Sequence, residues 1–306
     1  MSDGVRRPAL DLAPGFTTRF APAPTGYLHL GHAVNAVWVW GIARAFGGRV
    51  LLRIEDHDRG RCHARYEHAL LDDLDWLGLE PDGFGTDAFR TGPLAQRQSD
   101  GPERYAVHLS ALEARGLAYA CRCSRSEIAR ATAESGDTRY PGTCRAAAVA
   151  RDSTPARRVV MRGGESERFD DLRLGPQSQD PDLQCGDVLV RDRAGNWTYQ
   201  FAVVVDDLDQ GVDVIIRGED LLDSTGRQLR LARLLGRREA PRVLHHPLLR
   251  HPDGRKLSKS ARDTGLRELR AAGRTRADIL GLAAHVSGLA SLPTPLGPES
   301  LADLFR

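Results

Sequence analysis

The stretch FTTRFAPAPTGYLHLGH, residues 16–32, decides the predicted fold. Its first six residues, Phe16–Ala21, read as a buried strand, and the Pro/Gly-rich turn after them leads directly into a helix expected over His29–Phe46. A second short apolar strand is expected at Arg49–Ile54, followed by an amphipathic helix at Arg65–Leu77. This order of strand, helix, strand and helix predicts an α/β fold with a doubly wound parallel sheet of the Rossmann type.

The rest of the chain divides into an insertion, a return to the sheet and a tail. After a helix expected over Gln96–Gly116, composition changes and becomes rich in Cys, Arg, Asp, Gly and Pro. The apolar run Phe201–Val205 and a strand at Val212–Ile216 are expected to rejoin the main sheet. Further expected elements are strands at Arg158–Met161, Asp187–Val190 and Val243–His246 and a helix at Ser224–Leu235. The expected parts are a first half of the catalytic domain at 1–118, an inserted zinc-bearing subdomain at 119–196, a second half at 197–262 and a short helical C-terminal tail at 263–306.

Composition places the 306-residue chain among soluble globular proteins, with 41% hydrophobic and 27% charged residues. No apolar run approaches the roughly 20 residues that span a bilayer. The first residues show no pattern of a secretory signal. We therefore expect a cytoplasmic protein with no membrane partner.

Basic residues are distributed unevenly. Residues 227–276 carry 15 Lys and Arg against 4 Asp and Glu, a balance of +11 in a chain whose formal charge is +2. This segment favours a polyanionic partner, although solvated Arg-rich helices would give the same count. Only two of the 43 basic residues are Lys, and both lie in the pentapeptide KLSKS, residues 256–260. Because an ammonium is a compact point charge and a guanidinium a planar fork, we predict that this pentapeptide needs lysine for its chemistry.

The motif HLGH, residues 29–32, lies where the first strand gives way to a helix. Histidines three residues apart face the same way on a first helical turn, where backbone N–H groups and the helix dipole already favour phosphate. We expect His29 and His32 to be catalytic and to bind ATP phosphates, and Gly31 to leave room for the flat base. An isolated HxxH is more often helix surface, so the strand and turn before it carry the prediction.

The KLSKS segment is expected to be a loop that works on the same triphosphate. Its catalytic side chains would be Lys256 and Lys259, with Lys259 also binding ATP. Such a loop suits a reaction in which negative charge passes through a pentacoordinate phosphorus, because catalysis there is mainly positioning and electrostatic stabilisation. A solvated charged loop is the simpler alternative.

Three of the five cysteines cluster within 24 residues. They are Cys121, Cys123 and Cys144. Three thiolates at this spacing favour one structural zinc ion in a tetrahedral site, which needs a fourth ligand. No histidine lies between residues 109 and 244, so Asp137 and Glu134 are open alternatives. Unligated cysteines remain possible, and Cys62 and Cys185 read as structural.

Three other patterns contribute less. Gly83–Ala88 matches GxGxxA but follows a predicted helix, so it lacks the context of a dinucleotide-binding fingerprint. His245 and His246 fit a satisfied strand end better than a metal pair, and could line the ATP side of the pocket. The absence of a Walker A pattern counts against a P-loop kinase.

Taken together, HLGH and KLSKS resemble the two signatures of the class I aminoacyl-tRNA synthetases. Their surroundings resemble the glutamyl branch: RFAPAPTG at 19–26, LRIEDHD at 52–58, YQFAVVVDD at 199–207 and IRGEDLLDSTGRQ at 216–228. The resemblance covers about residues 16–262 with the motifs in the expected order. Within the branch, CRC, YPGTC and the short C-terminus look most like the glutamyl-Q tRNA(Asp) synthetases. Leu257 and Ala23 stand where Met and Ser are commoner, and neither difference removes a charge.

The resemblance implies a glutamate site formed by Arg19, Ala21, Ala23, Glu55, Tyr199 and Arg217. The chemistry of these residues agrees, because an amino acid with two carboxylates and one ammonium needs basic groups and an acid. Arg19 and Arg217 would bind carboxylates, Glu55 the ammonium, and Tyr199 would donate a hydroxyl. The resemblance also nominates Tyr140 as the fourth zinc ligand, and it implies ATP bound with Mg.

The implied activity is ATP-dependent activation of L-glutamate to glutamyl-adenylate without tRNA, then transfer to queuosine at the wobble position of tRNA(Asp). About 45 residues follow KLSKS, too few for an anticodon-binding domain of typical size. RNA choice would then need another surface, such as residues 227–276. The alternatives are a truncated glutamyl-tRNA synthetase that charges tRNA(Glu) and a non-catalytic RNA-binding paralogue. The intact motifs argue against the second.

Overall fold

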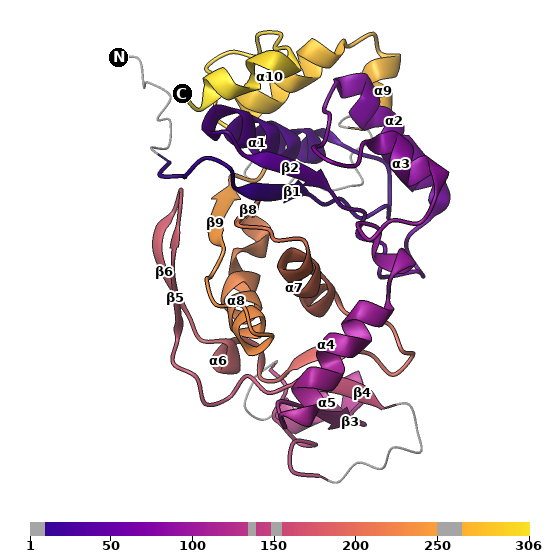
Figure 1. Ribbon diagram of the computed structural model, residues 1–306, viewed down its shortest axis with the longest axis vertical. Helices are drawn as coiled ribbons and strands as arrows, with labels where there is room; N and C mark the ends of the chain where they lie inside the picture. The colour runs from indigo at the N-terminus through magenta and orange to yellow at the C-terminus, as the bar shows by residue number, and fades with distance from the viewer. Residues whose placement is uncertain (1–9, 134–138, 148–154, 250–264) are drawn as a thin grey trace.

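The structure is a computed structural model that describes residues 10–133, 139–147, 155–249 and 265–306 (Figure 1). The N-terminal part forms β1 (Thr17–Phe20), α1 (Leu30–Phe46), β2 (Arg49–Leu52), α2 (Ala64–Leu77), α3 (Thr86–Thr91), the 3₁₀ turn η1 (Gln98–Asp100) and α4 (Glu103–Ala114). The middle part forms β3 (Ala118–Cys121), α5 (Arg125–Thr132), β4 (Ala156–Val159), β5 (Glu167–Asp171), β6 (Gly175–Gln179), α6 (Pro181–Cys185) and β7 (Val188–Arg191). The last part forms α7 (Tyr199–Asp209), β8 (Val214–Gly218), η2 (Glu219–Ser224), α8 (Thr225–Leu234), β9 (Arg242–His246), α9 (Leu266–Ala271), α10 (Arg276–Val286) and η4 (Pro298–Leu304).

Parallel strands from both ends of the sequence meet in the middle of the molecule. β1 and β2 pair in parallel, and a second sheet has the strand order β6-β5-β9-β8 with β8 and β9 parallel. The two sheets are joined at their edges: the Asp213 amide donates to the Thr17 carbonyl oxygen at 2.8 Å, and the Thr17 amide donates to the Asp213 carboxylate at 3.0 Å. The expected α/β class is confirmed.

The segment predicted as an insertion is divided between two places (Figure 1). β3, β4 and β7 form an antiparallel sheet of their own, whose core is shared with α4, α7 and α8. The hairpin β5–β6 instead reaches the main sheet, where Asp171 at the end of β5 pairs in parallel with Val243 of β9. The hairpin therefore brings a buried carboxylate next to the strands of the catalytic part.

Helix α1 connects β1 to β2, is buried along most of its length and packs on both strands. The C-terminal elements α10 and η4 pack against it (Figure 1). Gly41 makes this approach possible, because a Cβ there would lie 2.3 Å from the Phe305 ring and 3.0 Å from the Leu301 carbonyl oxygen. The helix ends at Gly47, whose φ of 70° is left-handed. Burial of an aromatic side chain such as Phe305 stabilises the fold by about 1.5–3 kcal/mol, so the last residues of the chain help to hold the first helix.

Two expected elements differ in the structure. The apolar run Phe201–Val205 was expected to rejoin the main sheet, and this is wrong, since these residues lie in helix α7. An unbroken apolar run fits a buried strand and a buried helix equally well, and α7 is covered by α4, α8 and β7. The helix predicted over Gln96–Gly116 is divided into η1 and α4 at Gly101 and Pro102. The other predicted strands and helices agree with the structure to within a few residues.

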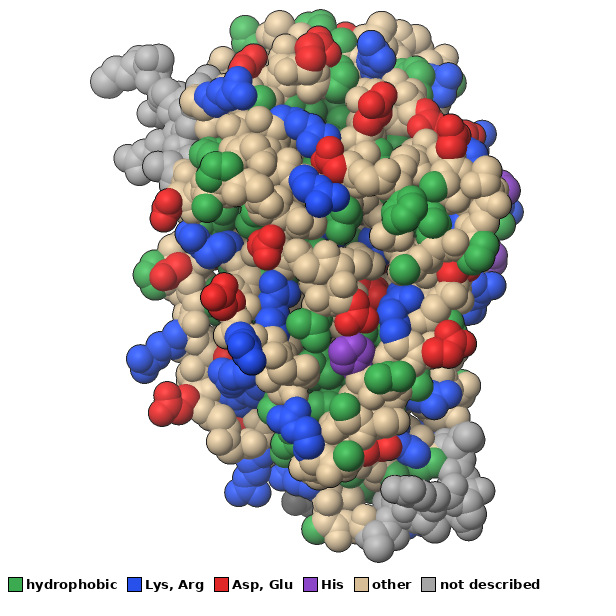
Figure 2. Space-filling model, viewed as in Figure 1, with side chains coloured by type: hydrophobic (Ala, Val, Ile, Leu, Met, Phe, Trp, Pro, Cys, Tyr) green, Lys and Arg blue, Asp and Glu red, His purple; other side chains and the backbone are tan. Residues whose placement is uncertain are grey.

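Charges of both signs are interspersed over the face in Figure 2. In the described part of the basic segment 227–276, two arginines pair with one acidic residue of β5. Arg230 is buried and donates to Glu167 at 2.8 Å, and Arg233 donates to the same carboxylate. Across the described residues, none of the helices combines the length and apolar character needed to cross a bilayer.

Candidate active site

A cavity of about 730 Å³ opens where β1, β2, β8 and β9 end. The carboxyl ends of parallel strands are where doubly wound sheets bind ligands. Nine of its lining residues are those that the sequence predicts for ATP and glutamate: Arg19, Ala21, Ala23, His29, Gly31, His32, Glu55, Tyr199 and Arg217. The structure thus brings together all of the predicted ATP and glutamate residues that it describes. Lys256 and Lys259 lie outside the described residues, and their roles remain predictions.

The two histidines of HLGH cap helix α1. His29 is the N-cap: its Nδ1 accepts the Gly31 amide at 3.1 Å, while Nδ1 of His32 accepts the His29 amide at 3.1 Å. A neutral imidazole whose Nδ1 accepts must carry its proton on Nε2. Both rings line the cavity, with centroids 4.1 Å apart. The capping bonds therefore fix two Nε2–H donors at a helix N-terminus, which is the arrangement that suits an anion.

Gly31 is required by the His29 ring. A Cβ at Gly31 would lie 2.9 Å from His29 Cε1 and 3.0 Å from its Nδ1, closer than side chains normally approach. The expectation from sequence was room for a flat base. In the structure, the group nearest to this position is instead the capping imidazole of His29. The absence of a side chain at residue 31 therefore allows the His29 ring to lie where it does.

A buried network of alternating charges supports one side of the cavity. Asp207 of α7 accepts from Arg19 at 3.1 Å and from Arg53 at 2.6 Å, and Arg53 also donates to Glu55 at 3.0 Å. Burial alone would raise the pKa of Asp207, but the two guanidinium groups outweigh it and lower that pKa. Arg19 is therefore already paired with a carboxylate, whereas sequence alone suggested a guanidinium available to a ligand.

Arg217 has a different environment. Its Nε donates to His245 Nε2 at 3.1 Å, Nη1 to Gln228 Oε1 at 2.6 Å and Nη2 to Thr225 Oγ1 at 2.9 Å. His245 Nδ1 in turn lies 2.6 Å from the Asp171 carboxylate at the end of β5. Among the described residues, no carboxylate forms an ion pair with Arg217, and burial lowers its pKa. A buried cation held by neutral acceptors and facing a cavity favours an anionic ligand.

Glu55, three residues after the end of β2, and Tyr199, the first residue of α7, line the same cavity. Burial raises the pKa of the Glu55 carboxyl, and Arg53 and Arg19 oppose this effect. Burial and the Glu55 charge both raise the pKa of Tyr199, which keeps its hydroxyl protonated as a donor. An acid and a hydroxyl donor thus lie beside two arginines, as an amino-acid ligand requires.

Sequence reasoning missed Asn35, which lines the cavity, whereas His246 was expected to line the pocket and does line the cavity. Asn35, one helical turn after His32, donates to His246 Nε2 at 3.0 Å, and His246 Nδ1 lies 3.0 Å from the Pro247 carbonyl oxygen. Burial lowers the pKa of His246 to about 4, so the ring is neutral. Because Asn35 follows His32 by three residues on the expected helix, the sequence could have placed both side chains on the same helix face. No sequence signal linked Arg53 to Asp207 or Asp171 to His245, since these pairs form only in the fold.

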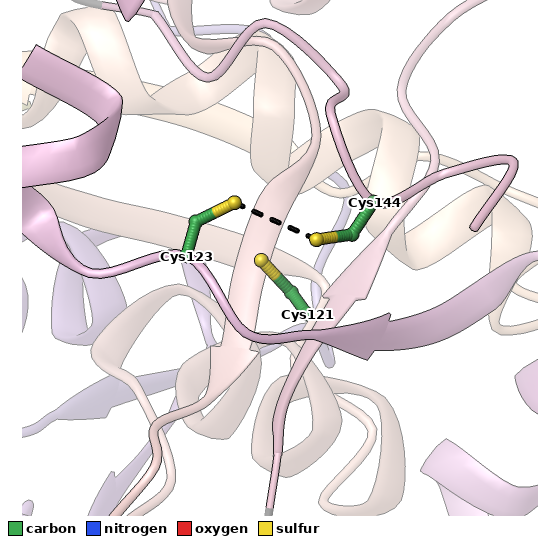
Figure 3. A group of neighbouring side chains, drawn as sticks. All are labelled: Cys121, Cys123 and Cys144. Carbon is green, nitrogen blue, oxygen red and sulfur yellow. Dashed lines mark hydrogen bonds between the residues drawn. The ribbon is translucent and has the colours of Figure 1, made fainter. Parts of the chain in front are cut away.

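The three clustered cysteines converge at the edge of the β3–β4–β7 sheet (Figure 3). Their Sγ atoms lie within 4.8 Å of one another, and those of Cys123 and Cys144 are 3.5 Å apart. A tetrahedral zinc ion with Zn–S bonds of about 2.3 Å separates its sulfurs by about 3.8 Å. The cluster therefore fits a metal ion, as the sequence predicts.

Tyr140 lies at the same point. Its Oη accepts from the Cys121 thiol at 3.4 Å and from the Cys144 amide at 2.9 Å, and it lies 3.7 Å from Cys123 Sγ. The side chain is buried, with the Arg158 guanidinium 3.7 Å from its ring centroid. The phenol oxygen thus lies within 3.7 Å of the sulfurs of Cys121 and Cys123 and accepts a hydrogen bond from the backbone of Cys144. The alternatives Asp137 and Glu134 lie outside the described residues.

The fold and the cavity agree with comparisons to known proteins. Residues 16–281 match the family of class I tRNA synthetases (E and Q), catalytic domain. The chain belongs to this family and is a ligase of the aminoacyl-tRNA synthetase type.

Within the family, several relatives named glutamyl-Q tRNA(Asp) synthetase are similar to this chain over most of its length. The chain is 42% identical over 299 residues to a glutamyl-Q tRNA(Asp) synthetase of Symbiobacterium thermophilum, covering 94% of this chain and 91% of that protein. It is 44% identical over 251 residues to the protein of that name from Pseudomonas fluorescens, covering 82% and 78%. The glutamate-tRNA synthetase structure from Elizabethkingia anophelis superposes with a TM-score of 0.79 at 24% identity. The match covers 95% of this chain but only 65% of that one, so this chain spans just under two thirds of its length.

Proposed function

We propose that this enzyme activates L-glutamate with ATP in the absence of RNA and then transfers it to queuosine of tRNA(Asp). The observation that carries the proposal is the meeting of nine predicted residues in one cavity of about 730 Å³. A cavity of this size can hold an amino acid together with a nucleotide. The second step is supported by the names of the relatives, which are 38–44% identical over most of the chain.

In the glutamate site, Arg217 is the side-chain carboxylate receptor. The support is its buried guanidinium, which is held by neutral groups and lacks a carboxylate partner among the described residues. Arg19, already paired with Asp207, helps to position the α-carboxylate, and Glu55 receives the ammonium. Tyr199 donates its hydroxyl, and the backbone at Ala21 and Ala23 forms the wall of the site.

In the activation step, an oxygen of the glutamate α-carboxylate attacks the α-phosphorus of ATP. The bond from that phosphorus to the bridging oxygen breaks, and pyrophosphate leaves with the electron pair. The Nε2–H groups of His29 and His32 stabilise the developing charge on the phosphates, as donors aimed at a transition state do. Lys256 and Lys259 add positive charge there, and ATP enters with Mg. The product is the mixed anhydride glutamyl-adenylate.

In the transfer step, a hydroxyl of the queuosine diol attacks the carbonyl carbon of the adenylate. The bond to the phosphate oxygen breaks, AMP leaves, and the hydroxyl proton is released. This step needs the base and its ring substituent to reach the cavity from outside.

Two structural roles complete the proposal. One zinc ion bound by Cys121, Cys123, Tyr140 and Cys144 would link β3 to the 139–147 segment and stabilise the subdomain. We also propose that the β1–β2 sheet and the β6-β5-β9-β8 sheet are parts of one doubly wound Rossmann-type sheet. The support is the pair of hydrogen bonds between Thr17 and Asp213.

Glutamate-dependent exchange between ATP and pyrophosphate without RNA tests the first step. We expect exchange with glutamate and none with glutamine. Transfer of labelled glutamate to tRNA(Asp) with and without queuosine tests the second, and we expect labelling only with queuosine. Labelling of tRNA(Glu) at its 3′ end would indicate the truncated synthetase instead. No exchange under any condition would contradict the proposed activity.

A further inference from the structure

We infer that a cluster of aromatic and cationic side chains at the edge of the cavity binds unpaired bases of an RNA loop. This rim platform consists of Tyr27, His63, Arg65, Tyr66 and Arg267. The inference rests on the proposed function, because the platform would hold the nucleotides that flank the nucleoside entering the cavity. It assigns an RNA surface to residues that have no part in the proposed activation of glutamate.

The platform side chains are mutually ordered. The Tyr27 and Tyr66 rings meet edge to face, with centroids 4.9 Å apart and an interplanar angle of 90°. Arg267 Cζ lies 4.4 Å from the Tyr27 centroid, and Arg65 Cζ lies 4.7 Å from that of Tyr66. The His63 ring lies 5.7 Å from the Tyr66 ring. Tyr27 is nevertheless 39% exposed, so part of its ring is accessible to a ligand.

Each of the three platform segments also reaches the cavity or its lining residues. The loop that carries Tyr27 lines the cavity with Thr25, and the segment before α2 lines it with Arg61. The His63 amide ties these two segments by donating to the carbonyl oxygen of residue 24 at 3.1 Å. α9 joins the same loop through a bridge between Gly265 and His29, and Figure 1 shows α9 beside α2. The platform therefore borders the cavity.

The chemistry of the platform fits single-stranded RNA. Unpaired bases in loops are bound by stacking on Tyr and His rings and on Arg guanidinium planes, with phosphates neutralised by the same arginines. Two nearby acids are already paired, Glu67 with Arg97 at 2.7 Å and Asp58 with Arg61 at 2.6 Å. A nucleoside that enters the cavity must leave its neighbours at this rim.

The test separates activation from transfer in the full-length protein. Tyr27→Ala should lower kcat/KM for transfer to queuosine-containing tRNA(Asp) by about 10-fold, because stacking contributes at that level. Exchange without RNA should stay within about twofold of wild type. Tyr27→Phe keeps the stacking face and should restore transfer.

Phe84→Ala is the matched control. Phe84 is also an exposed aromatic, at 50%, but it follows the far end of α2, whose 14 residues span about 21 Å. We expect Phe84→Ala to leave both steps unchanged.

The salt dependence of transfer gives a second measurement. A purely structural role of the two platform arginines would leave it unchanged. Arg65→Ala and Arg267→Ala should each reduce the slope of log(kcat/KM) for tRNA against log[salt] by about 0.7, if each neutralises one phosphate of a single strand. Unchanged transfer and slope in a Tyr27→Ala enzyme with normal exchange would overturn the platform and leave the proposed function intact. Equal loss of exchange and transfer would also overturn it. Absence of transfer in wild type would contradict the proposed function itself.

Discussion

The cavity and the cysteine cluster are both sites of converging polar side chains, but they are built from very different lengths of chain. The cysteine cluster draws its three sulfurs from residues 121–144. The cavity draws its lining from residues 19–249 and relies on pairs such as Arg19 with Asp207, 188 residues apart. A local site can be recognised by spacing alone. A distributed site depends on buried partners that only the fold supplies, so changes to the two sites should have different effects.

The largest effect on activity is expected from Arg217→Ala, which removes the buried cation of the distributed site. Loss of a buried, hydrogen-bonded charge contact costs about 4 kcal/mol, so kcat/KM for glutamate should fall about 10³-fold in the exchange assay. Arg230→Ala is the control, since Arg230 is equally buried but pairs with Glu167 away from the cavity. An Arg217→Ala enzyme with unchanged KM for glutamate would place the carboxylate elsewhere.

Gly31→Ala should displace the His29 ring, because the new Cβ would lie 2.9 Å from it. Loss of one aligned donor to the transition state lowers kcat by about 100-fold, with little change in KM for glutamate. Gly26→Ala, in the loop before α1, is the control, because no atom lies within 4 Å of the new Cβ. Wild-type exchange by Gly31→Ala would show that His29 need not hold this position.

Asp171→Asn tests whether the β5–β6 hairpin positions Arg217 through His245. The amide cannot hold the His245 Nδ1–H as the carboxylate does, so KM for glutamate should rise about 10-fold while KM for ATP stays constant. Asp187→Asn is matched, since Asp187 is also buried but bonds Tyr119 and Arg145 in the other subdomain. If both variants raise the two KM values alike, Asp171 has only a structural role.

Acidification should weaken glutamate binding through Glu55. Burial raises the pKa of Glu55 above its ordinary value of 4.5, so protonation begins at a higher pH than for an exposed glutamate. A protonated Glu55 no longer attracts the substrate ammonium. KM for glutamate should therefore rise as the pH is lowered towards and through this raised pKa. Glu55→Gln should have a high and flatter KM across this range; an unchanged profile would assign the ammonium to another group.

The smallest effect on activity is expected at the cysteine cluster. Cys144→Ser should lower zinc content, measured by elemental analysis, from one ion per chain. It should also lower the melting temperature by roughly 5 °C, the shift that about 2 kcal/mol gives in a chain of this size. Exchange at low temperature should change little, because the cluster lies outside the cavity lining. Cys62→Ser is the control, and a full zinc complement in Cys144→Ser would remove Cys144 from the ligand set.

Much of the fold followed from periodicity and turn residues. The strand before APAPTG, the helix after HLGH and the amphipathic helix α2 all lie where the sequence places them. The failure at Phe201–Val205 has a clear cause, because a helix buried on all sides loses the alternation that identifies its faces. The hairpin β5–β6 was also missed. Its residues alternate like those of an edge strand and carry no signal for the partner β9.

The residues of the site likewise include some that the sequence predicted and some that it did not. Short motifs identified the residues that line the cavity, because phosphate, carboxylate and metal chemistry each require particular side chains at particular spacings. They did not identify Asp171, and they did not predict the partners of Arg53 and His245, because these side chains act on other protein groups. Arg19 was expected to be available to a ligand, and its pairing with Asp207 could not be read from residues 188 positions apart.

By itself, the sequence determined which chemical groups this protein has and where along the chain they are concentrated. Two imidazoles three residues apart and three clustered thiols are local facts, since neighbours in the chain stay neighbours in space. Only the tertiary structure decided which charges are already paired and which face the cavity. That outcome depends on contacts between distant segments in a region from which water is excluded, where one carboxylate neutralises Arg19 and no described carboxylate pairs with Arg217.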